Sequence, residues 1–218
     1  MIKEPDIGYS RAGGTVYVVG STNIDLVFPI ERIPRRGETI AGGDVSVVPG
    51  GKGANQACAA ARSGAPTRLV SQVGTDPFAT ILRASLQEAG VDVSGVGHAD
   101  GSTGCAWIGV YPDGENSIIV SAGANATLTP EVALDRLGSL SMRDVVMLQL
   151  ETPLDTVAAV LKFARSCGAM TILDPAPAQL LPADVLGAVD LLTPNQREAA
   201  VLIGSADEEI ESHAQAGP

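Results

Sequence analysis

Aromatic residues are scarce in this sequence of 218 residues: they make up 3% of it, whereas 45% of its residues are hydrophobic. Ala, Val, Leu and Ile must therefore build the core, as they do in the layers of parallel α/β folds. Basic residues are also few, because 14 Lys and Arg stand against 25 Asp and Glu, for a formal net charge of -11. Nucleic acids and anionic membranes attract basic surfaces, so we expect neither as a partner.

Long apolar runs and cysteine patterns are missing as well. No stretch of 18 apolar residues occurs, and the first residues carry Lys3, Glu4 and Asp6 in place of the apolar core of a signal peptide. The three cysteines are odd in number and widely spaced, which fits neither a disulfide framework nor a metal site. We therefore expect a cytoplasmic protein.

The length of the chain predicts one domain with a substantial core. Residues 1–14 are polar and rich in glycine, so we expect a loose N-terminal extension. Residues 15–204 should form the domain, and residues 205–218 a polar, acidic tail.

Strand and helix patterns alternate along this domain, which predicts an α/β fold with a doubly wound, mostly parallel sheet flanked by helices. Gly64 and Gly90 follow two of the helices, where a left-handed cap is expected. The expected strands are 15–20, 67–73, 144–150, 170–174 and 189–193, and the expected helices are 54–63, 78–89, 130–138, 153–166, 183–186 and 196–203.

Two β segments interrupt the alternation. Residues 26–48 contain short alternating runs, in 26–30 and 38–48, broken by Pro34 and Gly37, and residues 103–121 give a hairpin pattern around Pro112-Asp113-Gly114-Glu115. They predict a small inserted β-sheet, here called the lid, that covers the polar corner described next.

The polar corner is predicted by the run Pro49-Gly50-Gly51-Lys52-Gly53-Ala54-Asn55-Gln56-Ala57. Glycine permits close ligand approach, free N–H groups at a helix start favour hydroxyl oxygens or anions, and Lys52 and Asn55 add directional donors. The spacing is neither a Walker A loop nor G-x-G-x-x-G. The alternative is a glycine turn that caps a helix beside a solvated lysine.

Three carboxylate or amide side chains follow predicted strands. Asn23 and Asp25 come just past the carboxyl end of the first strand, and Glu151 comes after strand 144–150. Ligands of open α/β sheets bind at these ends, and a sugar needs acceptors, amides and backbone N–H groups that converge on one pocket. Alternatively, Asp25 and Glu151 cap a turn or a helix.

Asn195 opens the last predicted helix right after a strand, and Glu198 follows one turn later on about the same face. An amide at that place can reach a nucleotide phosphate, which the helix dipole also favours. A capping Asn followed by an exposed Glu is the alternative.

These blocks, in this order, resemble the ribokinase-like carbohydrate kinases, also called the phosphofructokinase B-type superfamily. The likeness runs from about Val16 to Gly204 and combines Gly-Gly-Lys-Gly-Ala-Asn at residues 50–55 with Thr-Pro-Asn at 193–195. The wording of residues 20–25, 123–126 and 174–178 is most similar to the ribokinase branch.

The resemblance implies ATP-dependent phosphorylation of the primary hydroxyl of D-ribose or a similar pentose, with Mg²⁺ and a monovalent cation, K⁺. Asn23 and Asp25 would hold ribose hydroxyls, and Glu151 would accept from the sugar. Asn195 would contact the nucleotide, and Glu198 would help to organise magnesium through water. The cradle of the sugar would consist of Gly51, Lys52, Gly53, Ala54 and Asn55. The lid would also be the contact of a homodimer, so pentose, ATP and a second copy are the expected partners.

One part of the family pattern has no match in these residues. The catalytic base and the anion hole of such kinases come from a later Gly-Ala-Gly-Asp segment, which this sequence lacks. We therefore assign no catalytic residue, expect the C-terminal part of the family fold to be absent, and expect this chain to be inactive alone. Two alternatives remain: a non-catalytic sugar-binding or dimerising protein, and a kinase for a hexose, nucleoside or vitamin.

Overall fold

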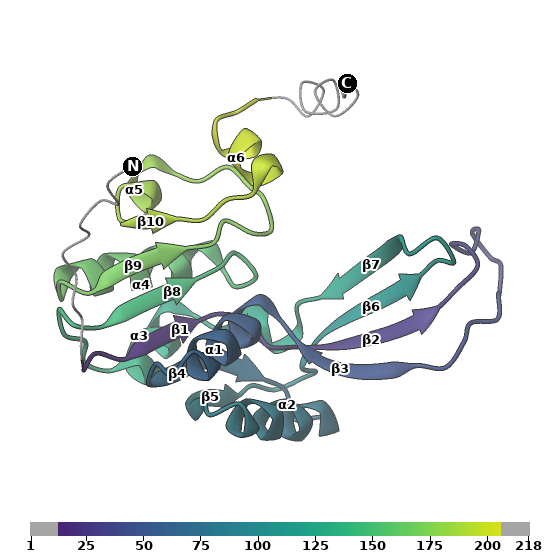
Figure 1. Ribbon diagram of the computed structural model, residues 1–218, viewed down its shortest axis with the longest axis horizontal. Coiled ribbons are helices and arrows are strands. Elements are labelled where there is room, and N and C mark those ends of the chain that lie inside the picture. Colours follow the sequence, from purple (N-terminus) through teal and green to yellow (C-terminus); the bar gives the residue numbers. More distant parts are fainter. Residues whose placement is uncertain (1–12, 206–218) are drawn as a thin grey trace, which may run out of the picture.

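The computed structural model describes residues 13–205, which form two sheets joined side by side (Figure 1). The larger sheet has six parallel strands in the order β10-β9-β8-β1-β4-β5. Its strands are β1 (Val16–Val19), β4 (Thr67–Val73), β5 (Asp92–His98), β8 (Val145–Leu148), β9 (Met170–Leu173) and β10 (Leu191–Leu192).

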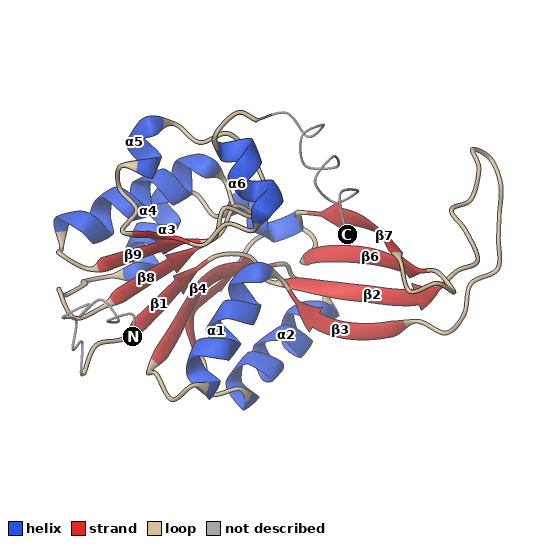
Figure 2. Ribbon diagram, turned by 45° about the horizontal axis from the view of Figure 1, so that its top comes forward, coloured by secondary structure: helices blue, strands red, loops and turns tan. Residues whose placement is uncertain are grey.

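Helices cover both faces of this sheet (Figure 2). One face packs on α1 (Lys52–Arg62) and α2 (Pro77–Glu88), and the other on α3 (Pro130–Leu137), α4 (Leu154–Ser166) and α5 (Ala183–Leu186). Neighbouring strand residues point to opposite faces of the sheet. Val18 packs in the cluster under α1 and α2, and Val19 packs in the cluster under α3, α4 and α5. The doubly wound fold is confirmed.

The smaller sheet has four strands in the order β3-β2-β6-β7. Its strands are β2 (Asn23–Pro29), β3 (Ser46–Gly50), β6 (Gly104–Val110) and β7 (Asn116–Ser121). The pair β2 and β6 is parallel and the two outer pairs are antiparallel. Because β2 follows β1 directly and β6 follows β5, this lid leaves the main sheet at the carboxyl ends of its strands, where ligands of α/β folds bind.

Several strands differ from the expectation: β2 begins at Asn23 and not at residue 26, and β10 spans only Leu191–Leu192 of the predicted 189–193. The strand β5 was not predicted, because Gly95 and Gly97 interrupt its apolar pattern; a side chain at Gly95 would lie 2.5 Å from the backbone oxygen of Leu69. The strand β3 is shorter than the predicted segment 38–48 and begins only at Ser46.

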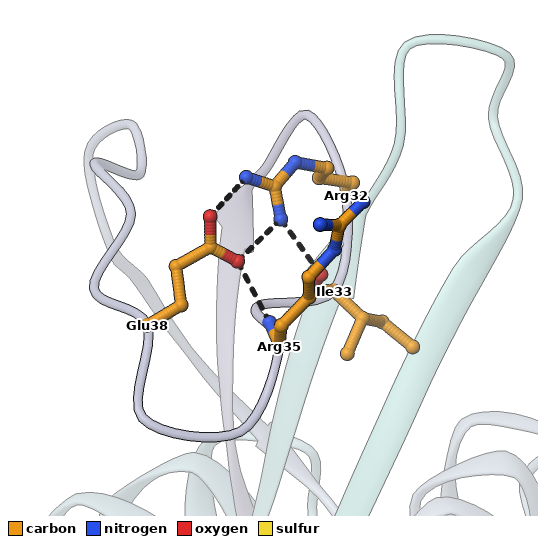
Figure 3. A network of polar contacts seen from close by, with 4 residues as sticks. All are labelled: Arg32, Ile33, Arg35 and Glu38. Carbon is orange, nitrogen blue, oxygen red and sulfur yellow. Dashed lines mark hydrogen bonds and ion pairs between the residues drawn. The ribbon is translucent and has the colours of Figure 1, made fainter.

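The residues before β3 form a loop, which is closed by an exposed charge network (Figure 3). The carboxylate of Glu38 accepts hydrogen bonds from the guanidinium of Arg32 and from the backbone N–H of Arg35. The bond from Arg32 is the main reason why the pKa of Glu38 lies below its ordinary value. These contacts fold residues 32–38 back on themselves, and the loop continues to Val45 before β3 begins.

Two predicted regions lie almost wholly outside the described residues, namely the N-terminal extension 1–14 and the acidic tail 205–218. The last helix, α6, spans Gln196–Leu202, and a short 3-10 helix, η1, spans Gly123–Thr127. Among the residues that the structure describes, no helix is both long and apolar enough to cross a membrane.

Candidate functional site

The start of α1 packs against the end of β1 without intervening side chains. A Cβ atom on Gly53 would lie 2.6 Å from the carbonyl carbon of Gly20, and a Cβ on Gly20 would lie 1.9 Å from Oε1 of Gln149. The backbone N–H of Ala54 donates to the carbonyl of Ser21 at 2.9 Å. Two glycines therefore bring the first turn of α1 directly onto the strand end.

Gly51 is the residue before α1 and has φ +94°, a conformation that favours glycine. A side chain there would also meet the backbone nitrogen of Asn23 at 2.7 Å. The helix begins at Lys52, two residues earlier than predicted, so Lys52 to Asn55 form its first turn.

Glu151 joins three distant segments at this point. Its Oε2 atom accepts from the hydroxyl of Ser21 at 2.5 Å and from the backbone N–H of Lys52 at 3.1 Å. The carboxylate thus lies at the start of α1, where the unpaired N–H groups of a helix favour negative charge. The structure brings together the predicted residues Lys52 and Glu151, and it adds Ser21, which the sequence analysis did not select.

Asn23 and Asp25 follow the carboxyl end of β1 and lie within β2, which begins three residues before the predicted lid segment. They pair in register with Gly50 and Val48 of β3 and with Gly104 and Ala106 of β6. The chain enters the lid immediately after β1, so the polar side chains that seemed to follow one strand begin the next.

The carboxylate of Asp25 covers Gly50, because a Cβ atom there would lie 2.3 Å from its Oδ2. Burial, and then the negative charge of Glu151, raise the pKa of Asp25 above its ordinary value. The carboxylates of Asp25 and Glu151 therefore lie close enough to repel each other. This arrangement favours a ligand that donates hydrogen bonds, such as a polyol.

A cavity of about 410 Å³ opens between the lid and the main sheet, and neither Asp25 nor Lys52 is among its lining residues. Both Asn23 and Glu151 line it, from opposite sides of the junction. The other lining residues are Val120, Ala122, Asn125, Ala126, Leu150, Thr152, Pro153 and Pro177. Its size suits a small ligand.

The remaining residues of the predicted cradle differ in exposure. The side chain of Ala54 is 5% exposed and belongs to the core cluster under α1. Asn55 is exposed, and its backbone N–H donates to Gly51 at 2.9 Å. Gly53 is required for packing on Gly20.

A chain of side-chain amides runs beneath the corner and was not predicted. Gln149, which is fully buried, donates to Oε1 of Gln56 at 2.5 Å, and Gln56 donates to Oδ2 of Asp174 at 3.2 Å. Burial raises the pKa of Asp174, and the charge of Lys52 opposes that effect. Asp174 is thus placed at the corner, although no role was predicted for it.

The predicted nucleotide-side pair forms a capping box. Oδ1 of Asn195 accepts from the backbone N–H of Glu198 at 2.9 Å, and the carboxylate of Glu198 accepts from the backbone N–H and the side-chain amide of Asn195 at 2.8 and 2.7 Å. The structure therefore has the geometry of the capping alternative. Across residues 13–205 there is no group of three or more His, Cys, Asp or Glu side chains arranged to hold a metal ion.

Comparisons with known proteins agree with this geometry. The family model described as pfkB family carbohydrate kinase matches residues 14–218. The chain is 41% identical over 190 residues to the ribokinase of Bacillus subtilis and 37% identical over 191 residues to that of Haemophilus influenzae. These matches cover 86% and 87% of this chain but only 64% and 62% of the two ribokinases, so the chain spans less than two thirds of their length.

A solved structure of the Arabidopsis thaliana ribokinase, complexed with ribose and ATP, is also similar. It matches with a TM-score of 0.81 and 33% sequence identity, over 93% of this chain and 67% of that one.

Proposed function

Because the chain belongs to the pfkB family of carbohydrate kinases, we propose that it forms the sugar-binding part of an ATP-dependent kinase for D-ribose or a similar pentose. The observation that carries this proposal is the junction at Glu151, which joins Ser21, the start of α1 and the cavity lined by Asn23. The Arabidopsis ribokinase that resembles this chain binds ribose and ATP, which supports the same choice of ligands.

The proposed roles follow from the chemistry of each group. The carboxylates of Asp25 and Glu151 accept hydrogen bonds from sugar hydroxyls, and Asn23 and Lys52 donate to hydroxyl oxygens. The backbone from Gly51 to Asn55 leaves room for close approach, since its glycines carry no side chain.

On the nucleotide side, ATP is the proposed phosphoryl donor, with Asn195 in contact with it. The proposed role of Glu198 in magnesium binding has less support, because both of its carboxylate oxygens already accept hydrogen bonds from Asn195. Among the described residues, no group of three or more His, Cys, Asp or Glu side chains is arranged to hold a metal ion.

Phosphoryl transfer also needs a group that takes the proton of the attacking hydroxyl and donors for the phosphoryl oxygens. The Gly-Ala-Gly-Asp segment that supplies them in the family does not occur in these 218 residues. We propose that these residues alone bind sugar without turnover. The alternative of a non-catalytic sugar-binding protein rests on the same observations. The corner at Glu151 is assembled, whereas Asn195 and Glu198 form a helix cap.

Titration calorimetry with D-ribose tests the sugar assignment. Lys52→Ala and Asp25→Ala should each weaken binding by about tenfold or more, because each removes a charge-assisted hydrogen bond. Lys162→Ala is the matched control, since this lysine forms an exposed ion pair with Asp184 far from the corner. Equal affinities for the wild type and both corner variants would contradict the proposal.

The lid is the proposed contact of a homodimer. Its outer face carries a row of apolar side chains across the strands, in which Val47, Trp107 and Ile119 are 47%, 51% and 72% exposed. Such a patch marks an interaction surface. Light scattering after size-exclusion chromatography should show a dimer that Trp107→Glu converts to monomer, whereas a monomeric wild type would contradict this contact.

A further inference from the structure

Asn125 lies in η1 and is not among the proposed sugar ligands, yet it is only 2% exposed and contacts the start of the lid. Its Oδ1 accepts from the backbone N–H of Thr22 at 2.9 Å. Its Nδ2 donates to the carbonyl of Thr22 at 3.2 Å and to Oδ1 of Asn23 at 2.7 Å. All three hydrogen bonds are buried.

These contacts fix the direction of two side-chain amides. A backbone N–H can only donate, so the N–H of Thr22 requires the oxygen of Asn125 on its side. The nitrogen of Asn125 must then face Asn23, which can answer only with its own oxygen. The nitrogen of Asn23 is left on the other side of its amide, and Asn23 lines the 410 Å³ cavity.

Glycine at position 104 makes room for this arrangement. Asn23 pairs with Gly50 of β3 and with Gly104 of β6. A Cβ atom on Gly104 would lie 2.2 Å from Nδ2 of Asn125 and 2.3 Å from Oδ1 of Asn23, in the middle of their hydrogen bond. The bond between the two amides therefore requires glycine at position 104.

We infer that Asn125 is a positioning residue that makes Asn23 a hydrogen-bond donor toward the ligand. This inference rests on the proposed function of the corner. It specifies that the ligand group at Asn23 is an oxygen that accepts a hydrogen bond, such as a hydroxyl group that donates its own proton to a carboxylate in a second hydrogen bond. Asn23 then donates to the oxygen of a sugar hydroxyl, and a carboxylate of the corner accepts from its hydrogen.

The orientation can be measured in the free protein by NMR hydrogen exchange of the side-chain amides. We expect the Nδ2 protons of Asn125 to exchange at least tenfold more slowly than those of Asn23, because only the former are bonded within the protein. Equal protection, or slower exchange at Asn23, would overturn the inference whether or not a sugar binds.

Asn125→Asp tests the consequence for binding. The new carboxylate still accepts from Thr22 but cannot donate, so the amide of Asn23 should turn its nitrogen inward and present its oxygen to the cavity. Ribose affinity should fall by about tenfold. The control is Thr127→Val in the same 3-10 helix, which removes hydroxyl contacts to Ala124 and Gln72 without touching Asn23, and should change affinity less than twofold.

A series of monodeoxy riboses separates positioning from general damage. The loss in Asn125→Asp should vanish for the one sugar that lacks the hydroxyl bound by Asn23 and persist for the others. A uniform loss for all sugars would overturn the inference. Absence of any binding by the wild type would instead contradict the proposed function, while the exchange measurement still decides the orientation of Asn23.

Discussion

At the polar corner around Glu151 the hydrogen bonds join residues far apart in the chain, whereas at the start of α6 they join residues three positions apart. Ser21 and Glu151 are separated by 130 residues, and Lys52 and Glu151 by 99. The bonds between Asn195 and Glu198 close within one helical turn.

This difference bears on what each region can do. The corner exists only when β1, α1 and the segment after β8 are packed together, so its geometry is a product of the whole sheet. The capping box at α6 needs one turn of helix and satisfies its own polar groups. The polar corner thus depends on the whole fold, whereas the hydrogen bonds between Asn195 and Glu198 are those of a local helix cap.

The largest expected effect is that of Gly53→Ala. Alanine favours a helix over glycine by about 1 kcal/mol, but here its Cβ would lie 2.6 Å from the backbone of Gly20. We expect the free energy of unfolding to fall by about 1–3 kcal/mol, as in an overpacked core, and ribose binding to be lost.

Urea denaturation measures this change. Thr80→Ala, at an exposed position of α2, is the control for helix propensity and should be neutral or slightly stabilising. If Gly53→Ala were as stable as the wild type, the close approach of α1 to β1 would not be required.

A smaller effect is expected for Asn195→Ala, which removes the cap of α6. The cost should be about 1 kcal/mol, and ribose affinity should not change, because the capping contacts do not extend beyond α6.

Ser21→Ala is the matched change at the corner: it removes the bond to Glu151 and should lower both stability and affinity. The contrast between the two regions would be lost if Asn195→Ala weakened ribose binding as much as Ser21→Ala.

The elements of the main sheet could largely be predicted from the sequence, because apolar periodicity and glycine caps are local signals. Gly64 and Gly90 have φ of +91° and +86°, as their positions after helices predicted. The strand β5 was missed because Gly95 serves close packing against β4 and Gly97 makes room for the guanidinium of Arg136, which no local pattern reveals.

The site could be predicted in part. The run at Gly51 to Asn55 and the residues Asn23, Asp25 and Glu151 were selected from their positions near strand ends. The partners Ser21, Gln149 and Asn125 were not, since their contacts join residues 93 to 130 positions apart and depend on the strand order. For Asn195 and Glu198 both readings were open, and the contacts made in the structure are those of a cap.

The smallest expected effect has the opposite sign and concerns Asp25. Burial and the charge of Glu151 raise the pKa of this carboxyl in the folded protein. A raised pKa means that the contribution of Asp25 to stability is fully present below the pKa of the unfolded chain, about 3.9, and is lost as the pH rises through the folded value. At neutral pH the ionised group therefore destabilises the fold.

Asp25→Asn should raise the free energy of unfolding at pH 7 by about 0.5 kcal/mol, and the gain should disappear near pH 3.5. Ribose binding should weaken in the same variant, because an amide cannot replace the charged acceptor. Urea denaturation at the two pH values measures the gain, with Asp44→Asn in the exposed lid loop as the control. A variant less stable than the wild type at pH 7 would show that the ionised carboxylate of Asp25 stabilises the folded protein, which would contradict this prediction.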